Sequence, residues 1–405
     1  MDERYALVRR QLEDGGVDVD AVEAALKAQR IATPSWGYAD SGTRFGTFRQ
    51  PGAASTVHEK LADAAQAHRY IGIAPAVALH IPWDKVDDWA GLGRDAASLG
   101  IEIGAINPNV FQDHEYRFGS LASERPDVRR RALAHIAECV SIMRAVGSKS
   151  LSLWFADGTN FPGQGDFRAR KRRFADGLAE VHRLLAVDET MLVEYKPFEP
   201  ASYHTDIADW GMAYAFCLKA GARAKVLVDL GHHLHGANIE HIVAFLVDES
   251  RLGGFHFNNR KYADDDLTTG SINPYELFLI YTELVKADRA GLGEEIAYMI
   301  DESHTLKNKI AEMIQSLVAL QTSYAKALLV DWTALAHAQA SEDLIGAEEV
   351  LKTAFAVDVA PLLWKVRSDI GLPDPIDPVR GFRQSGYTEK AAAERRGGGV
   401  SQLGA

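Results

Sequence analysis

The chain has 405 residues, of which 47% are hydrophobic and 25% are charged, and its 44 Lys and Arg against 56 Asp and Glu give a formal net charge of -12. This balance is typical of a globular protein and excludes a disordered chain, which would contain fewer apolar and aromatic residues. The acidic excess also argues against a protein that binds a nucleic-acid backbone through an overall basic face, because such binding displaces counterions with positive charge.

Cys139 and Cys217 both lie in apolar segments with helical spacing, which indicates buried thiols rather than a disulfide framework. The N-terminal segment MDERYALVRRQLED is charged from its second residue and has no apolar signal-peptide core. No segment approaches about 18 uninterrupted apolar residues, the length of a membrane span. We therefore expect a cytoplasmic protein.

The first 30 residues have helical apolar spacing and predict a helical leader over 1–30. A short apolar run followed by a longer amphipathic stretch then recurs eight times, with runs at 44–49, 76–81, 101–106, 150–155, 191–196, 225–230, 252–257 and 296–301. Strands that alternate with helices predict a parallel sheet, and eight of them favour a closed (β/α)8 TIM barrel, here over 31–305. No GxGxxG follows the first run, which counts against a dinucleotide-binding sheet.

From residue 306 onward the pattern is helical only, as in NKIAEMIQSLVALQ and AEEVLKTAFAV. These segments are too apolar to face water on every side. We expect residues 306–405 to form a C-terminal α-helical extension that packs on the barrel or on another subunit. From Gly371 the chain becomes rich in Pro, Gly and charge, which predicts an irregular tail.

Polar residues at the ends of the predicted strands are candidates for a functional site, because TIM-barrel active sites lie at the carboxyl ends of the strands. Those that could bind a metal ion are Glu194, Asp229, His232, His256, Asp264, Asp266 and Asp301. Carboxylates and imidazoles without thiols suit Mg²⁺, Mn²⁺, Co²⁺ or Zn²⁺. Converging carboxylates would repel one another unless cations neutralised them, so the pattern predicts a two-metal site.

Each candidate taken alone has a simpler explanation. Glu194 could form a salt bridge with Lys196, which lies two residues on and therefore on the same face of the strand. His256 between two Phe residues could be a core histidine, and the acidic run that includes Asp264 could be a solvated loop. The coincidence of potential ligands at four successive strand ends favours the metal site over these separate explanations.

The segments VEYKPFEP, VDLGHHLHGAN, GFHFNNRKYADDDLTTGSINPYELF and MIDESH together resemble the broad-specificity bacterial L-rhamnose isomerases of the Pseudomonas type. More distantly, the pattern is similar to the xylose isomerases. The resemblance extends from about Arg30 to about Leu320. It implies a (β/α)8 barrel, two divalent cations per subunit, a homotetramer, and interconversion of an aldose and its ketose. Mn²⁺ is the cation most expected, with Co²⁺, Mg²⁺ or Zn²⁺ as alternatives.

The resemblance also implies roles for individual residues. A structural metal would be held by Glu194, Asp229, His256 and Asp301, and a catalytic metal by Glu194 as a bridge, His232, Asp264 and Asp266. Lys196 and His80 would contact the sugar, Trp83 and Trp154 would form apolar walls, and Phe45 would reach into a neighbouring subunit's site. The expected catalytic residues are Lys196, His80 and Asp301.

A site with many metal ligands and few basic side chains that do not bind a metal favours a metal-assisted hydride shift between C1 and C2 over an enediol route. In this scheme Lys196 donates a hydrogen bond to a substrate oxygen, and His80 assists ring opening. We expect L-rhamnose and L-rhamnulose as the main pair, with tolerance for pairs of the D-allose/D-psicose type.

Two other functions fit parts of the sequence. A metal-dependent hydrolase or abasic-site endonuclease on the same barrel would use similar ligands, but the net charge of -12 argues against a DNA substrate. The basic run FRARKRRF at 167–174 is better explained as the exposed face of a helix start. A sugar- or metal-binding protein without activity is the other alternative, since fold alone does not fix function. The seven candidate ligands argue against it.

Overall fold

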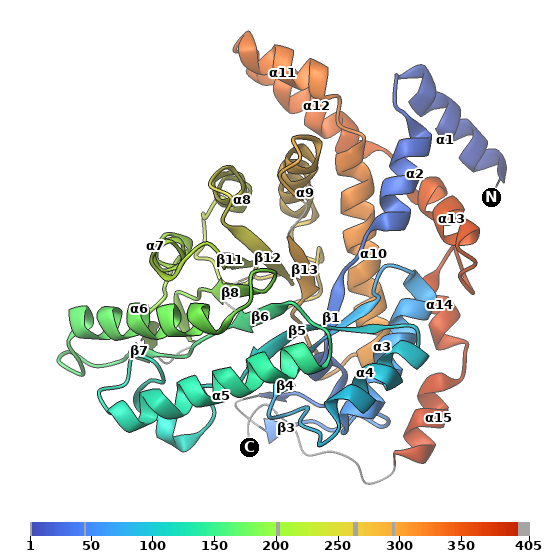
Figure 1. The fold of residues 1–405 in the computed structure, drawn as a ribbon. Helices are drawn as coiled ribbons and strands as arrows, with labels where there is room; N and C mark the ends of the chain where they lie inside the picture. The colour runs from blue at the N-terminus through green and yellow to red at the C-terminus, as the bar shows by residue number, and fades with distance from the viewer. Residues whose placement is uncertain (1, 44–45, 200–202, 262–265, 294–295, 396–405) are drawn as a thin grey trace.

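The computed structural model describes residues 2–43, 46–199, 203–261, 266–293 and 296–395 (Figure 1). Eight parallel strands form a closed barrel in the order β1-β13-β12-β11-β8-β6-β5-β4. They are β1 (Ala32–Pro34), β4 (Ala76–Ile81), β5 (Glu102–Pro108), β6 (Ser150–Leu153), β8 (Thr190–Glu194), β11 (Ala224–Asp229), β12 (Leu252–Phe257) and β13 (Ala297–Ile300). The predicted (β/α)8 TIM barrel is confirmed.

The first barrel strand lies earlier in the chain than the sequence indicated. We predicted it at 44–49, but β1 spans Ala32–Pro34 and pairs with β4 and β13. A three-residue strand that ends in proline has neither the length nor the apolar run by which strands are recognised. The chain at the predicted position instead contributes to a two-stranded antiparallel sheet of β2 (Gly42–Thr43) and β3 (Gly46–Thr47).

The helices α3 to α10 surround the strands (Figure 1). They are α3 (Val57–Ile71), α4 (Trp89–Ser98), α5 (Pro126–Ala145), α6 (Phe167–Leu184), α7 (Trp210–Ala220), α8 (Ile239–Asp248), α9 (Pro274–Arg289) and α10 (Lys309–Leu328). All except α5 begin after a Thr, Asp or Asn whose side chain accepts a hydrogen bond from a backbone N–H of the first turn. The ring closes with α10, which packs on α9 and α3, although our division at residue 305 placed this segment in the extension.

Shorter elements lie over the ends of the strands. A three-stranded antiparallel sheet consists of β7 (Gly158–Thr159), β10 (Tyr203–Thr205) and β9 (Phe198–Glu199). The 3-10 helices η1 (Ser35–Tyr38) and η2 (His114–Phe118) follow β1 and β5. Cys139 and Cys217 are buried free thiols, as predicted. Among the described residues, no helix is both long and apolar enough to cross a membrane.

The terminal helices lie along one side of the barrel (Figure 1). At the N-terminus, α1 (Asp2–Asp14) and α2 (Val19–Ala28) pack against α13 (Ala360–Asp369), and a small separate core forms between α2, α13 and the end of α10. The helices α11 (Trp332–Ala340) and α12 (Leu344–Ala356) form a hairpin that projects away from the barrel (Figure 1).

The tail after Gly371 is more regular than predicted. It contains α14 (Pro378–Arg383) and α15 (Tyr387–Glu394). The ring of Phe382 packs edge-on against Tyr70 at 5.7 Å, and Arg395 forms a 2.8 Å ion pair with Asp63 on α3. These contacts anchor a segment whose composition alone suggested a loop. Residues 396–405 lie outside the described part of the chain.

Candidate active site

Four neighbouring strands, β8, β11, β12 and β13, place a carboxylate or an imidazole at the same end of the barrel. Glu194 and Asp229 are the last residues of β8 and β11, and Asp301 directly follows β13. Each of these three carboxylates comes two positions after a side chain of the barrel interior, namely Leu192, Leu227 and Met299. Because side chains two apart on a strand share a face, the three carboxylates point into the mouth of the barrel.

His256 on β12 lies among these carboxylates. Glu194, Asp229 and His256 are buried and offer ligand atoms that all lie within 4.8 Å of one another. The Nδ1 atom of His256 is 3.3 Å from Oε1 of Glu194, 3.6 Å from Oδ2 of Asp229 and 3.9 Å from Oδ2 of Asp301. The structure therefore brings together the four residues that the resemblance implies for a structural metal.

His232 lies on the other side of Glu194. Its Nδ1 atom is 3.1 Å from Oε1 of Glu194, 4.0 Å from Oδ1 of Asp229 and 3.0 Å from the carbonyl oxygen of Tyr195. Two imidazoles thus approach the same oxygen of Glu194, as expected for a carboxylate that bridges two neighbouring cations.

The other expected ligands of the second metal are only partly described. Asp266 is connected to the cluster through Asn258, whose amide nitrogen lies 3.4 Å from Oδ1 of Asp266. Asp264, and also Phe45, which was expected to reach a neighbouring subunit, lie outside the described residues.

The charges in this cluster shift one another's pKa values strongly. Burial lowers the pKa of His256, but the carboxylates of Glu194, Asp301 and Asp229 outweigh it and raise the pKa to about 9. Burial would raise the pKa of Glu194, but His256 and His232 lower it to about 2. Burial raises the pKa of Asp301 to about 7. The carboxylates of Asp229 and Glu194 also raise this pKa, whereas His256 lowers it. Three carboxylates around one imidazole leave an excess of negative charge that a cation would neutralise.

The donor set fits a divalent cation. The Nδ1 atom of His256 is buried and makes no hydrogen bond with any described residue, although carboxylate oxygens surround it. Such an unpaired nitrogen is costly in a protein interior, and a metal ion at the centre of the cluster would take the place of its proton and bind its lone pair. Carboxylate oxygen and imidazole nitrogen are ligands that suit Mn²⁺, Co²⁺, Mg²⁺ and Zn²⁺.

Trp36 and Asn258 support the cluster through hydrogen bonds, although the sequence did not indicate that they belong to the site. The indole Nε1 of Trp36, in η1, donates a 2.8 Å hydrogen bond to Oδ1 of Asp301. The amide nitrogen of Asn258 lies 3.0 and 3.3 Å from the two carboxylate oxygens of Asp229 and 3.2 Å from the carbonyl oxygen of Asp301. Asn258 was visible as a polar residue at a strand end, whereas nothing in the sequence around Trp36 connected it with residue 301.

We expect Asn258→Leu to weaken metal binding by about 10- to 100-fold, which is the usual loss when a residue that orients a metal ligand is removed. The reason is that Asp229 would lose its 3.0 Å amide donor and could rotate. Titration of the metal-free protein with Mn²⁺, followed by electron paramagnetic resonance, would measure the effect. Asn107→Leu is the matched control, because Asn107 is the second-last residue of β5 and donates to the carbonyl oxygen of Leu79. Equal affinities in the two variants would contradict the assigned role.

A row of rings extends from β4 toward β8 beside the cluster. His80 stacks on Trp83 at 5.3 Å, Trp83 meets Phe111 edge-on at 6.2 Å, and Phe111 meets Trp154 edge-on at 4.7 Å. The ammonium of Lys196 lies 5.1 Å above the ring of Trp154. The four residues expected to contact a sugar therefore lie in one row, and Phe111 is a member that the sequence did not indicate.

The end of β4 is held by a buried ion pair. Lys60 and Asp84 are completely buried, and Nζ of Lys60 lies 2.5 Å from Oδ1 of Asp84. The other oxygen of Asp84 accepts hydrogen bonds from the hydroxyl of Ser35, at 2.5 Å, and from the backbone N–H of His80, at 2.8 Å. This carboxylate therefore fixes the backbone of His80 relative to η1.

We expect Lys60→Met to lower the free energy of unfolding by about 3–5 kcal/mol, because it leaves the charge of Asp84 buried without a cation. Guanidinium unfolding would show a lower midpoint with an unchanged slope. A double variant that also carries Asp84→Ala should recover part of the loss, since the stranded charge is gone. A single variant as stable as the wild type would mean that the pair does not stabilise the fold.

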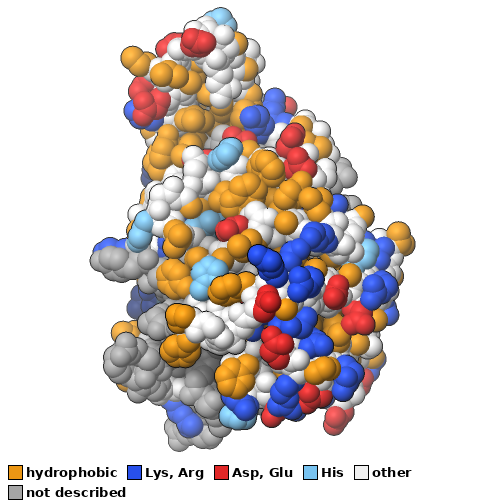
Figure 2. Space-filling model, turned by 90° about the vertical axis from the view of Figure 1, so that its left-hand side faces the viewer, with side chains coloured by type: hydrophobic (Ala, Val, Ile, Leu, Met, Phe, Trp, Pro, Cys, Tyr) orange, Lys and Arg blue, Asp and Glu red, His pale blue; other side chains and the backbone are white. Residues whose placement is uncertain are grey.

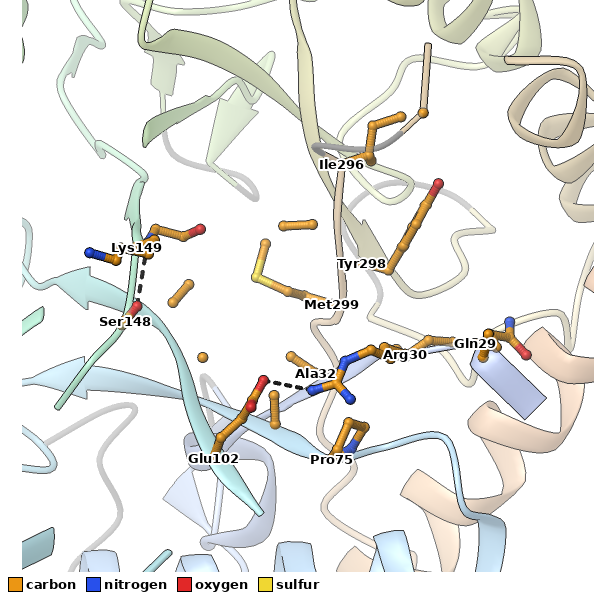
Figure 3. A pocket seen from close by; sticks show the side chains of 18 of the residues that line it. Gln29, Arg30, Ala32, Pro75, Glu102, Ser148, Lys149, Ile296, Tyr298 and Met299 are labelled. Carbon is orange, nitrogen blue, oxygen red and sulfur yellow. Dashed lines mark hydrogen bonds and ion pairs between the residues drawn. The ribbon is translucent and has the colours of Figure 1, made fainter. Parts of the chain in front are cut away.

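A separate cavity of about 640 Å³ lies at the opposite end of the barrel (Figure 3). It is lined at the strand starts by Ala32, Ala76 and Ala297, where larger side chains would fill the interior. An ion pair of 2.8 Å between Arg30 and Glu102 spans part of its wall (Figure 3). TIM-barrel enzymes carry their active sites at the carboxyl ends of the strands, so we place the candidate active site at the cluster of Glu194, Asp229 and His256 and not in this cavity.

A model of the xylose isomerase-like TIM barrel family matches residues 62–289, which is more than half of the chain. The chain belongs to this family. The matched range contains Glu194, Asp229 and His256, while Asp301 and Trp36 lie outside it.

Similar proteins carry names that concern sugars. A probable sugar isomerase of Rhizobium meliloti (strain 1021) is 44% identical over 407 residues, which cover 98% of this chain and 94% of that protein. A probable sugar isomerase of Mesorhizobium japonicum is 42% identical over 397 residues, covering 96% and 92%. A solved structure of L-ribulose 3-epimerase is similar in fold, with a TM-score of 0.54 at 15% identity, covering 75% of this chain and 98% of that one.

Proposed function

We propose that this member of the xylose isomerase-like TIM barrel family is a metal-dependent aldose–ketose isomerase. Its main pair is L-rhamnose and L-rhamnulose, with tolerance for pairs of the D-allose/D-psicose type. The observation that carries the proposal is the buried cluster of Glu194, Asp229 and His256 at the barrel mouth, beside an aromatic row that ends at Lys196. The two relatives named as probable sugar isomerases support the reaction class.

Two divalent cations per subunit would occupy the site, with Mn²⁺ as the first choice and Co²⁺, Mg²⁺ or Zn²⁺ as alternatives. Glu194, Asp229, His256 and Asp301 would hold one of them. Glu194, His232, Asp264 and Asp266 would hold the other. When bound, the cations supply Lewis-acid polarisation of the sugar oxygens O1 and O2.

The residues around the cations would bind and orient the open sugar chain. Lys196 donates a hydrogen bond to a substrate oxygen, and its position above Trp154 restricts where that oxygen can lie. Burial lowers the pKa of His80 to about 4, so this imidazole is neutral near pH 7. Its Nδ1 atom is buried and has no hydrogen-bond partner in the described part of the chain, which leaves it able to accept the proton of the anomeric hydroxyl as the ring opens. Trp36 keeps Asp301 oriented through its 2.8 Å hydrogen bond.

The hydrogen would move between C1 and C2 with its electron pair, because the site offers many ligands and few free bases. The reaction in deuterated water tests this step. We expect the product to carry almost no deuterium at the transferred position, as judged by proton nuclear magnetic resonance. Substantial incorporation from solvent would instead show a base that exchanges its proton, and Lys196 would be the first candidate.

The function itself is tested by a panel of aldoses. The protein is treated with a chelator, Mn²⁺ is restored, and kcat/KM is measured for L-rhamnose, L-mannose, L-lyxose, D-allose and D-xylose. We expect turnover of several aldoses, with differences of about 1–3 kcal/mol in transition-state binding for each methyl or hydroxyl group at the far end of the sugar. No metal-dependent turnover of any aldose would overturn the proposal. Cleavage of abasic-site DNA would then favour the metal-dependent hydrolase, which could use the same carboxylates.

The assembly proposed with this function is a homotetramer. It rests on the resemblance to the L-rhamnose isomerases and on the apolar C-terminal helices, and light scattering of the purified protein would measure it.

A further inference from the structure

The segment between β12 and α9 carries Asp266, one of the ligands proposed for the second cation. The backbone φ of Asp266 is 43°, in the left-handed region that residues other than glycine rarely adopt. Such a backbone conformation persists only where surrounding contacts hold it in place. The position of Asp266 therefore depends on what anchors the residues that follow it.

One anchor of this segment is Asn259, which lies just after β12. Leu267 and Asn259 exchange two backbone hydrogen bonds of 2.8 Å. The side-chain oxygen of Asn259 also accepts a hydrogen bond from the backbone N–H of Ile272 at 2.8 Å. These contacts fix the two ends of residues 267–272, but they do not hold the middle of this stretch.

The middle is held by Glu302, which directly follows Asp301. One carboxylate oxygen of Glu302 accepts hydrogen bonds from the backbone N–H of Thr269, at 2.9 Å, and from its hydroxyl, at 3.1 Å. The other oxygen accepts a hydrogen bond from the hydroxyl of Ser316 on α10. Glu302, Thr269 and Ser316 are at most 1% exposed. The three hydrogen bonds therefore form in the interior, where water competes little with them.

Glu302 differs from the acidic side chains at the surface of the protein. On the face shown in Figure 2, acidic side chains lie close to Lys and Arg side chains. Glu302 forms no ion pair with a described residue, and its partners are two hydroxyl groups and one backbone amide. A buried carboxyl group that loses its donors is costly, so moving Thr269 away from Glu302 is penalised. The segment is thus held in one position and not only restricted by packing.

The neighbouring residues Asp301 and Glu302 link the two halves of the candidate site. Asp301 belongs to the cluster around His256, whereas Glu302 holds the segment that carries Asp266. The amide nitrogen of Asn258 lies 3.2 Å from the carbonyl oxygen of Asp301 and 3.4 Å from Oδ1 of Asp266. A shift of the segment would move Asp266 relative to the cluster while the ligands on the strands stayed in place.

We propose that Glu302 is a positioning residue that sets the place of Asp266, and thereby the affinity for the second cation, without contacting either cation. This role rests on the proposed function, because it requires the second cation site. A change at Glu302 should therefore weaken one of the two cation sites selectively. A residue that only stabilises the fold would affect both sites or neither.

The first test titrates the metal-free, full-length protein with Mn²⁺ and follows binding by electron paramagnetic resonance. The wild type should bind two ions. In Glu302→Leu one affinity should fall by about 10- to 100-fold, the usual loss on removing a residue that orients a metal ligand, while the other stays unchanged. Glu189→Leu is the matched control, because Glu189 is also buried but precedes β8 at the other end of the barrel. Both of its affinities should equal those of the wild type.

The variant Asp266→Asn identifies the affected site. It should lower the same affinity as Glu302→Leu, and the double variant should lose little more than either single variant, because both changes act on one ligand. Losses that simply add, or a loss in the other affinity, would overturn the proposal.

Milder variants separate hydrogen bonding from charge. Glu302→Gln keeps an oxygen that can accept from Thr269 and places an amide beside the hydroxyl of Ser316, so its two affinities should stay near those of the wild type. Thr269→Val removes only the hydroxyl donor and should cause a smaller loss in the same affinity as Glu302→Leu. A loss in Glu302→Gln as large as in Glu302→Leu would overturn positioning through these hydrogen bonds.

Hydrogen exchange of the metal-free protein, followed by nuclear magnetic resonance, gives a readout that does not depend on the reaction. The amide of Thr269 donates to Glu302, so it should exchange faster in Glu302→Leu than in the wild type. The amide of Leu267, which donates to the backbone of Asn259, should change less. Equal exchange at Thr269 in both proteins would overturn the proposal.

The two levels of the proposal fail in different ways. A wild type that binds fewer than two Mn²⁺ ions would overturn the two-cation site and the role of Glu302 together. Two ions bound with unchanged affinities in Glu302→Leu would overturn the role of Glu302 alone.

Discussion

Glu194→Gln should abolish both metal binding and isomerase activity. Glu194 is the carboxylate that lies 3.1 Å from His232 and 3.3 Å from His256, so it would serve both cations. The variant keeps the shape of the side chain but removes its charge. Removing a residue that only orients a metal ligand lowers activity by up to about 100-fold, so the loss in kcat/KM on removing Glu194 itself should be larger than this. Metal analysis of the purified protein and an isomerase assay measure the two effects.

Glu189→Gln is the matched control for this prediction. Glu189 comes just before β8, at the other end of the strand from Glu194, and it forms a 2.8 Å ion pair with Arg144. The same change there should leave metal content and turnover near their normal values. A Glu194→Gln protein that kept two bound metals and normal turnover would show that the ligand set is wrong.

Chelation should lower the stability of the protein markedly. Each cation that binds only the folded chain stabilises it by RT ln(1 + [L]/Kd), which is about 2.7 kcal/mol when its concentration is about 100 times Kd. The effect has a structural cause, because Asp229, Glu194 and Asp301 repel one another around His256 when no cation is bound. Burial of Asp301 and its acidic neighbours already raise the pKa of this carboxyl to about 7, which is a sign of that repulsion.

Thermal unfolding with and without chelator, followed by restoration of Mn²⁺, measures this effect. The melting temperature should fall on chelation and return with the metal. The Glu194→Gln protein provides the control, since its melting temperature should respond little to either treatment. Equal melting temperatures for the wild type in both conditions would contradict a metal site in the cluster.

The sequence predicted the barrel because the alternation of short apolar runs with amphipathic stretches is a local property of the chain. It failed at β1, where three residues ending in Pro34 are held in the barrel by pairing with β4 and β13 on either side. It also failed after Gly371, where Phe382 and Arg395 anchor the tail through contacts with α3, more than 300 residues earlier. In both cases the structure depends on partners that are distant in sequence.

In the candidate site, too, the sequence indicated what depends on local pattern and missed what depends on contacts between distant segments. Glu194, Asp229, His256 and Asp301 could be named from their positions at strand ends, because in a closed parallel barrel all such ends meet at one mouth. The resemblance to a family implied that these four residues hold one metal and that Glu194 bridges it to a second. The sequence did not indicate Trp36 or Phe111. The indole of Trp36 donates to Asp301 and the ring of Phe111 lies between Trp83 and Trp154, but no sequence pattern distinguishes either residue from a core aromatic.

By itself, the sequence determined the class of fold, the candidate cluster of acidic residues and the end of the barrel at which it gathers, since these follow from the spacing of residue types along the chain. Only the tertiary structure decided which oxygen of Glu194 faces two imidazoles, which donors hold Asp229 and Asp301, and how the α11–α12 hairpin stands away from the barrel. The reason is physical. Spacing along the chain fixes which face of a strand or helix a side chain occupies, but hydrogen bonds and exposed surfaces depend on how segments far apart in sequence pack together.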